Sequence, residues 1–172
     1  MPGMPRISPK KFSRRLSKFG LGLNEKKTRL LEFGRFAAER RKRRGMRRPE
    51  TFDFLGFTHY CCMNRNGHFF VMRKTQRARM IRKLKELRTE ARRRMHWPLR
   101  KQQRWLAAVL RGHYGYYGYL GNSRALSNFA YQVRKLWFRA LCRRSQKNAM
   151  TWERFNRLLK VFPLPVPRIV RT

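Results

Sequence analysis

The stretch RWLAAVLRGHYGYYGYLG, residues 104–121, is the most unusual segment of the chain, because an apolar run is followed by closely spaced tyrosines and glycines. Its first half has apolar residues at helical spacing, and its second half alternates four tyrosines with glycines at 112, 115, 118 and 121. A glycine inside a helix costs about 0.5–1 kcal/mol relative to alanine, so a run of four needs a physical reason. Close helix packing is one reason, and stacking of the tyrosines on exposed bases beside arginines is the other.

The patterns on either side of this stretch predict an α+β fold. Residues 51–60 and 68–72 are aromatic and β-rich and flank a turn signal at 64–67, which predicts a β-hairpin. Apolar residues three and four positions apart predict amphipathic helices over residues 75–95, 126–141 and 151–162. Thr151 is expected to cap the last helix, and prolines at 163, 165 and 167 predict an extended tail.

The N-terminal third has weaker patterns. Residues 1–11 contain three prolines and are expected to form a loose lead-in. Residues 12–19 predict a short helix that ends at Gly20, and the apolar run at 29–33 predicts a short strand. Residues 37–48 are rich in arginine and nearly free of large apolar side chains, so we expect a solvated loop.

The charge of the chain indicates a polyanionic partner. Lysine and arginine number 45 against 8 acidic residues, a formal net charge of +37 over 172 residues. Nucleic acid is the polyanion that best neutralises such a surface, and a membrane surface is the weaker alternative. Apolar residues make up 41% of the chain, which predicts a folded core. No apolar run is long enough to span a membrane and no secretory signal core is present, so we expect a cytoplasmic protein.

Acidic residues are too scarce for metal-dependent chemistry. Asp53 is the only aspartate, whereas two-metal polymerases and nucleases need several converging carboxylates. The sequence therefore predicts no catalytic residue, no metal site and no cofactor, and the glutamates are expected to pair with nearby cations. His59, Cys61, Cys62 and His68 fall within ten residues, but their spacing matches no standard zinc pattern, and two strands that carry them are the simpler interpretation.

Several blocks of sequence resemble the C-terminal part of bacterial group II intron reverse transcriptases, which also act as maturases. The first block covers residues 23–37, and the second is Pro-Glu-Thr-Phe-Asp-Phe-Leu-Gly-Phe-Thr at 49–58. A basic helix from residue 73 and Arg-Gly-His-Tyr-Gly-Tyr-Tyr at 111–117 follow, and then Asn-Ser-Arg-Ala-Leu at 122–126 and Thr-Trp-Glu-Arg at 151–154. The resemblance extends from about residue 12 to residue 168.

The resemblance implies a domain organisation. Residues 12–73 would be the end of the polymerase palm, residues 74–162 the helical thumb or maturase-specific domain, and residues 163–172 an extended tail. By resemblance, Phe54, Leu55, Gly56 and Phe57 belong to the primer grip. Lys27 and Thr28 match the end of a palm motif that reads Pro-Glu-Lys-Thr in the family.

The family's catalytic part is missing from this sequence. The Tyr-Ala-Asp-Asp motif, an earlier aspartate and the fingers do not occur in it. We therefore expect no DNA synthesis by this chain alone, and Mg²⁺ would serve only the full-length parent polymerase and the intron ribozyme.

The function implied is that of a maturase module that assists the folding and splicing of a group II intron. Its partner would be structured intron RNA, with an RNA/DNA hybrid as a further partner, in a bacterial cytoplasmic ribonucleoprotein. Two alternatives stay open. The chain could be part of an RNA-directed DNA polymerase completed by a separate N-terminal fragment, or a general basic component of a ribonucleoprotein.

The residues expected to bind RNA are cations on the helix faces and members of the tyrosine-glycine segment. His113 is expected to contact RNA or to lie in the core rather than to act as an acid or base. The full set is Arg79, Arg82, Lys83, Lys85, Arg104, Arg111, His113, Tyr114, Tyr116, Tyr117, Arg124, Arg134, Lys135, Arg139, Arg143 and Arg144.

Overall fold

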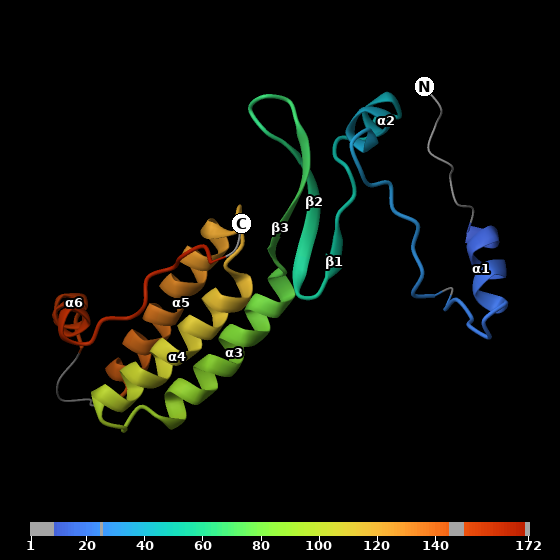
Figure 1. Ribbon diagram of the computed structural model, residues 1–172. Coiled ribbons are helices and arrows are strands. Elements are labelled where there is room, and N and C mark those ends of the chain that lie inside the picture. The colour runs from blue at the N-terminus through green and yellow to red at the C-terminus, as the bar shows by residue number, and fades with distance from the viewer. Residues whose placement is uncertain (1–8, 25, 145–149, 171–172) are drawn as a thin grey trace. The chain divides into compact units, whose positions relative to one another are not determined.

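The computed structural model of the chain describes residues 9–24, 26–144 and 150–170, and it confirms the α+β class (Figure 1). Of the loose lead-in expected at residues 1–11, residues 1–8 lie outside the described residues and residues 9–11 belong to α1 instead. Glu25, in the block that resembles the palm, also lies outside the described residues. The elements are α1 (Pro9–Ser17), α2 (Ala37–Arg43), β1 (Phe52–Phe54), β2 (Phe57–Met63), β3 (Phe69–Thr75), α3 (Arg77–Arg93), α4 (Leu99–Tyr117), α5 (Ser123–Cys142) and α6 (Trp152–Val161).

The chain divides into two compact units, Met1–Glu50 and Thr51–Thr172. The sheet therefore belongs to the same unit as α3 to α6. This division differs from the boundary near residue 73 that the family resemblance implies between palm and thumb.

The first unit contains α1, which confirms the helix expected over residues 12–19, although it begins at Pro9 and ends at Ser17. Two other predictions were wrong, because residues 29–33 form no strand and Ala37–Arg43 is a helix rather than a solvated loop. Two glutamates account for the difference, since they supply the arginines of this region with partners. Glu32 pairs with Arg40 and Arg44, and Glu50 pairs with Arg29 and Arg41 and accepts a hydrogen bond from the Glu32 amide at 2.6 Å.

The second unit begins with an antiparallel sheet in the order β1-β2-β3. The expected hairpin is confirmed as β2 and β3, which pair from Phe57 opposite Thr75 to Met63 opposite Phe69. The run at 51–60 is not one strand, because it reverses at Leu55 and Gly56, whose φ angles are +48° and +80°. Two successive positive φ angles produce the tight turn that suits the twist of paired strands.

Helices α3, α4 and α5 lie side by side (Figure 1) around an apolar core. Each presents one apolar stripe to the others, as the three-and-four spacing predicts. The core consists of Leu87, Leu106, Leu110, Tyr114, Leu126, Phe129, Val133, Trp137, Leu141 and Phe155. The cap expected at the last helix is confirmed, because the Thr151 hydroxyl oxygen accepts a hydrogen bond from the Arg154 amide at 3.3 Å.

A buried asparagine joins the sheet to the helices. Asn122 Oδ1 accepts a hydrogen bond from the Thr75 amide at 3.0 Å, and its Nδ2 donates to Thr75 Oγ1 at 2.9 Å and to the Tyr117 carbonyl at 2.8 Å. Since β3 continues to Thr75, α3 starts at Arg77, two residues later than expected. These bonds fix the end of the hairpin against the C-terminal end of α4.

The tail after α6 is extended, as expected, and it lies along α4. The carbonyl of Pro163 accepts a hydrogen bond from Gln103 Nε2 at 2.7 Å, and the carbonyl of Pro165 accepts one from the Tyr114 hydroxyl at 3.2 Å. Farther along, the Val170 amide donates to the Gly118 carbonyl at 2.7 Å. The tail therefore completes the packing of α4.

Candidate nucleic-acid interface

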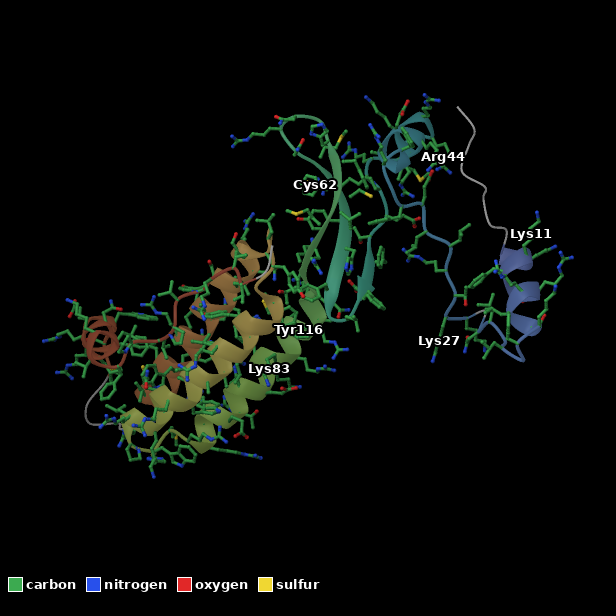
Figure 2. All side chains as sticks on the ribbon, in the orientation of Figure 1. Lys11, Lys27, Arg44, Cys62, Lys83 and Tyr116 are labelled. Atoms are coloured by element: carbon green, nitrogen blue, oxygen red, sulfur yellow. The ribbon has the colours of Figure 1, made fainter. Side chains whose placement is uncertain are left out.

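A groove between α3 and α4 brings together several of the residues expected to bind RNA. It encloses about 450 Å³, and Figure 2 labels Lys83 from its α3 side and Tyr116 from its α4 side. We call it the α3–α4 groove. Its lining consists of Arg79, Met80, Arg82, Lys83, Glu86, Ala108, Val109, Gly112, His113, Tyr116, Tyr117 and Phe129.

The α3 side of the groove is positively charged. Arg79, Arg82 and Lys83 are exposed there, and Glu86 is the acidic residue of the lining. Glu86 lies 4.0 Å from Arg82 and 3.3 Å from Lys83, whereas Arg79 has no ion pair with any carboxylate in the described ranges. Exposed ion pairs are worth about 1 kcal/mol or less, so phosphate oxygens can replace Glu86 at little cost. Three cations against one carboxylate leave the groove with a surplus of positive charge.

The glycines of the tyrosine-glycine segment fall into two classes. A Cβ placed on Gly112 or Gly115 would have no neighbour within 4 Å, although α4 continues unbroken through both positions. Close helix packing therefore does not explain these two glycines. They leave free space beside the α4 backbone, into which the backbone of another molecule can approach.

The other two glycines are required by packing. A Cβ on Gly118 would overlap the Tyr114 carbonyl oxygen and would lie 3.1 Å from the Arg168 carbonyl oxygen of the tail. A Cβ on Gly121, where φ is +82°, would collide with the side chain of Met72. Close packing therefore explains Gly118 and Gly121 but not Gly112 and Gly115.

Tyr116 joins the groove to the turn between β1 and β2. Its hydroxyl donates a hydrogen bond to the Leu55 carbonyl at 2.7 Å, and its ring stacks on that of Phe57 with centroids 5.7 Å apart. Phe54 and Leu55 are 60% and 68% exposed at this turn. Residues 54–57, the primer-grip residues by resemblance, thus lie beside the tyrosine segment although about sixty positions separate them in sequence.

Two residues of the tyrosine-glycine segment are buried, which agrees with the core alternative for His113 and leaves almost none of the Tyr114 ring exposed for stacking on a base. His113 is 9% exposed and its ring stacks on Phe129 with centroids 3.6 Å apart. Burial, and secondarily the charge of Lys83, lowers the pKa of His113 to about 4. Tyr114 is 3% exposed, and burial raises the pKa of its hydroxyl, which donates to the Pro165 carbonyl, to about 12. Both residues occupy the apolar stripe of α4, so their ring faces are used inside the protein.

Most of the other expected contacts lie outside the groove. Lys85 of α3, Arg104 and Arg111 of α4, and Arg124 and Arg144 at the two ends of α5 are exposed. Arg134 lines a cavity beside the tail, and the Lys135 ammonium lies over the Tyr131 ring at 5.4 Å. Lys27 and Thr28, from the motif that resembles the palm, belong to the first unit, where both bond to Asn24.

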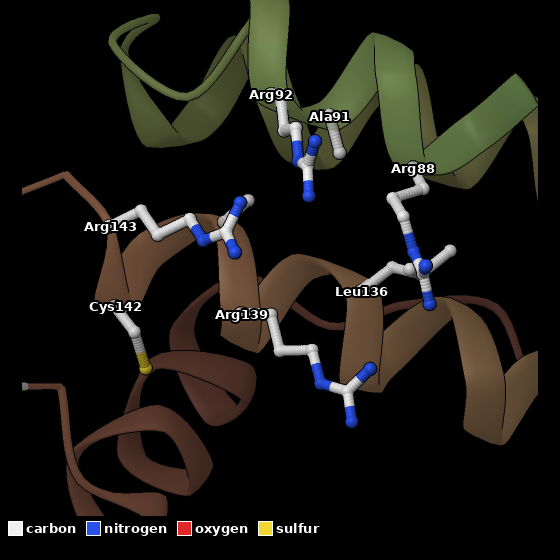
Figure 3. A pocket seen from close by; sticks show the side chains of 8 residues that line it. Arg88, Ala91, Arg92, Leu136, Arg139, Cys142 and Arg143 are labelled. Carbon is white, nitrogen blue, oxygen red and sulfur yellow. The ribbon is translucent and has the colours of Figure 1, made fainter. Parts of the chain in front are cut away.

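Sequence reasoning missed two arginines of α3, Arg88 and Arg92. They line a second cavity together with Arg139 and Arg143 of α5, which were expected to bind RNA (Figure 3). The missed signal was available in the sequence, because each pair is spaced four residues apart on its helix with no acidic residue three or four positions away among the described residues.

Asp53 has a structural role in the sheet. Its Oδ1 accepts a hydrogen bond from Thr58 Oγ1 at 2.5 Å, and its Oδ2 accepts one from Gln76 Nε2 at 2.8 Å. His59 stacks on Phe52 with ring centroids 4.8 Å apart. Within the described residues, no group of three or more histidines, cysteines and carboxylates is placed to hold a metal ion.

Comparisons of this chain with protein families, with curated proteins and with solved structures find no match. Within the part of the chain that the structure describes, no helix is both long enough and apolar enough to cross a membrane.

Proposed function

We propose that this chain is an RNA-binding module that assists the folding and splicing of a group II intron, and that the α3–α4 groove is its main RNA contact. The observation that carries the proposal is the convergence of α3 cations, open α4 glycines and Tyr116 beside the β1–β2 turn. This combination supplies the three kinds of contact that single-stranded parts of a folded RNA require.

The groove matches the chemistry of an RNA backbone. Arg79, Arg82 and Lys83 would hold phosphate oxygens, and arginine forks do so with two parallel hydrogen bonds. Gly112 and Gly115 would let a strand approach the α4 backbone more closely than any side chain allows. The strand would thus run along the helix between the cations and the glycines.

The tyrosine end of the groove suits an unpaired base. Tyr116 is 49% exposed, and its hydroxyl bond to Leu55 fixes the ring in place. Stacking of a base on an aromatic ring is worth about 1–3 kcal/mol. Phe54, exposed at the adjacent turn, offers a second apolar surface. Unpaired bases are accessible in loops and bulges of folded RNA, which favours structured RNA over a plain duplex as the partner.

The sequence resemblance narrows the RNA to a group II intron. The family's primer-grip block and its tyrosine block are far apart in sequence, and in this chain they meet at the Tyr116 to Leu55 hydrogen bond. The polymerase alternative is less well supported, because the oxygens of the only aspartate, Asp53, are occupied by Thr58 and Gln76. The module would therefore act by stabilising an RNA that performs its own chemistry.

The test compares a groove variant with a matched control that removes the same charge and the same aromatic ring. The groove variant is Arg79→Gln/Arg82→Gln/Tyr116→Ala, and the control is Arg77→Gln/Arg100→Gln/Tyr131→Ala, whose side chains are all exposed. The groove variant should bind a group II intron RNA tenfold or more weakly than the wild type, because it loses a base stack and two phosphate contacts. The control should lose less than threefold.

The measurements are filter binding of intron RNA and of an unrelated RNA, and intron splicing at low Mg²⁺ with and without protein. Helical circular dichroism must first establish that both variants are folded. Equal losses in the two variants would mean that binding is generic attraction between opposite charges. If the protein binds the intron but does not accelerate splicing at low Mg²⁺, the proposed role in splicing is wrong, whereas the proposed RNA contact is still supported.

A further inference from the structure

The second cavity, between α3 and α5, contains four arginine side chains. Arg88 and Arg92 come from α3, Arg139 and Arg143 come from the end of α5, and the space encloses about 360 Å³. Figure 3 shows the guanidinium groups of Arg92 and Arg143 extending into the gap between the two helices. We call this space the four-arginine cavity.

The charge of the four-arginine cavity is not neutralised by acidic residues. Its other lining residues are Ala91, Leu136, Ala140 and Cys142, none of which carries a negative charge at neutral pH. The nearby glutamates of α3 pair elsewhere, since Glu86 contacts Arg82 and Lys83, and Glu90 contacts Arg93 and Arg94. Guanidinium groups stay protonated in proteins, so all four charges persist.

The cavity is more positive than the α3–α4 groove. Four cations and no carboxylate line the cavity, whereas three cations and one carboxylate line the groove. Gathering like charges destabilises the folded protein unless an anion is bound, so such a cluster indicates an anion site. Arg88, Arg92 and Arg139 stand on two packed helices and Arg143 directly follows α5, and the guanidinium fork suits planar, bidentate recognition of phosphate.

We infer that the four-arginine cavity binds closely spaced phosphate groups of an RNA strand, at a site separate from the α3–α4 groove. Arg79 in the groove and Arg88 in the cavity are nine residues apart on α3, which places them about 180° apart around the helix axis. α3 would thus lie between two RNA segments. The choice of RNA rests on the proposed function, whereas the phosphate chemistry rests on the arginines alone.

Cys142 makes it possible to observe occupancy of the cavity directly. Its thiol lines the cavity, is half-buried and donates a hydrogen bond to the Met150 carbonyl at 3.6 Å. A bound anion would cover the thiol and keep an alkylating reagent away from it. Cys61 and Cys62 are also half-buried and lie on β2, so they serve as internal controls within the same chain.

The first arm of the experiment measures alkylation of each cysteine by mass spectrometry, with and without inorganic tripolyphosphate at constant ionic strength. Tripolyphosphate should slow alkylation of Cys142 at least fivefold and leave Cys61 and Cys62 unchanged. The variant Arg92→Gln/Arg139→Gln should lose this protection. The control Arg77→Gln/Arg100→Gln, which removes two exposed arginines that line neither cavity, should keep it. Equal alkylation of Cys142 with and without tripolyphosphate would overturn the site.

The second arm replaces tripolyphosphate with RNA and distinguishes the two sources of phosphate. RNA should also protect Cys142, and Arg92→Gln/Arg139→Gln should lower RNA affinity about tenfold more than the control does. Protection by tripolyphosphate but not by RNA would make this a site for a free polyphosphate and overturn the RNA assignment. Failure of the proposed function gives a different result. The groove variant would then keep its affinity for intron RNA, whether or not tripolyphosphate protects Cys142 from alkylation.

Discussion

His113 is a buried imidazole that the fold holds in its neutral form. It lies against Phe129 in the core between α4 and α5, and burial lowers its pKa from 6.5 to about 4. Its Nε2 atom has no hydrogen-bond partner among the described residues. Protonation would place a positive charge in this apolar setting, close to Lys83, which is the physical cause of the low pKa.

The first prediction concerns pH. Unfolded histidine titrates near 6.5 and folded His113 near 4, so between these values the unfolded chain binds more protons than the folded one. The stability that neutral His113 contributes is fully present above about pH 6.5 and is lost as the pH falls towards 4. The slope attributable to one proton is about 1.4 kcal/mol per pH unit. Urea unfolding at pH 7, 5.5 and 4.5 measures it.

The matched variant for this prediction is His113→Leu, which keeps an apolar side chain of similar size and cannot bind a proton. Its unfolding free energy should depend less steeply on pH than that of the wild type between 6.5 and 4.5. Identical slopes in the two proteins would show that His113 does not titrate in this range.

α4 is the element on which packing and recognition meet. One face carries Leu106, Leu110 and Tyr114 into the core, and another carries Gly112 and Gly115 with open space beside them. A helix that served only for packing would gain stability from alanine at both glycines. Glycine at these two positions therefore lowers helix stability and leaves the α4 backbone accessible, which is what the proposed RNA contact needs.

The second prediction follows from this exchange. Gly112→Ala/Gly115→Ala should raise the unfolding free energy by about 0.5–1 kcal/mol per site, because alanine favours the helix and meets no neighbour. The same variant should bind intron RNA several-fold more weakly, because two methyl groups occupy the space proposed for the strand. Thermal unfolding and filter binding measure the two effects.

Gly118→Ala serves as the contrasting variant on the same segment. Its Cβ would overlap the Tyr114 carbonyl oxygen and press on the tail, so it should destabilise the protein. If the double variant instead keeps full RNA affinity, no backbone approaches α4, and the glycines have another cause.

Much of this element-scale organisation could be predicted from spacing alone. The apolar stripes placed α3, α5 and α6 to within a few residues, and Thr151 marked the start of α6. The turn at Leu55 and Gly56 could not be predicted, because a leucine with positive φ has no sequence signature. The helix Ala37–Arg43 was missed because the glutamates that pair with its arginines, Glu32 and Glu50, lie outside the helix in sequence. Glu50 follows the last residue of the helix by seven positions, so no pattern within the helix indicates the pairing.

The candidate site was predicted in part. Arg79, Arg82 and Lys83 were found because a basic helix face is visible as a pattern, and Tyr116 because its segment is unusual. For His113 and Tyr114 the sequence could not decide between the core and an RNA contact, since aromatic residues at helical spacing fit both, and the structure buries both side chains. The spacing of Arg88 and Arg92 was visible in the sequence, but it does not show that these two arginines meet Arg139 and Arg143 across the α3–α5 contact.

At the scale of the whole molecule, the formal charge of +37 dominates every encounter with a polyanion. The structure distributes part of this charge to two separate places, the α3–α4 groove and the four-arginine cavity. Elsewhere, glutamates already pair with cations, as Glu39 does with Arg43 and Glu90 with Arg93. Affinity for RNA should therefore depend strongly on salt.

The third prediction gives this dependence a magnitude. If about eight phosphates are neutralised, log affinity should fall with log salt concentration at a slope of roughly −6, using about −0.7 per contact for single strands. Arg92→Gln/Arg139→Gln should flatten the slope by about 1.4, because two contacts are removed. RNA binding titrations at salt concentrations from about 50 to about 300 mM, which bracket physiological ionic strength, measure the slope. A slope near zero would exclude the basic faces as the binding surface.

The tail bound along α4 also sets an order in time. The residues that cover Tyr114 and Gly118 are Pro165, Arg168 and Val170, and a ribosome makes them after every helix of the bundle. Synthesis proceeds at about 5–20 residues per second, so Tyr114 and Gly118 are made several seconds before the tail residues that cover them. Any RNA near the ribosome meets this chain before its own tail does. If the chain binds RNA at α4 as proposed, the tail and nucleic acid compete for this helix during co-translational folding.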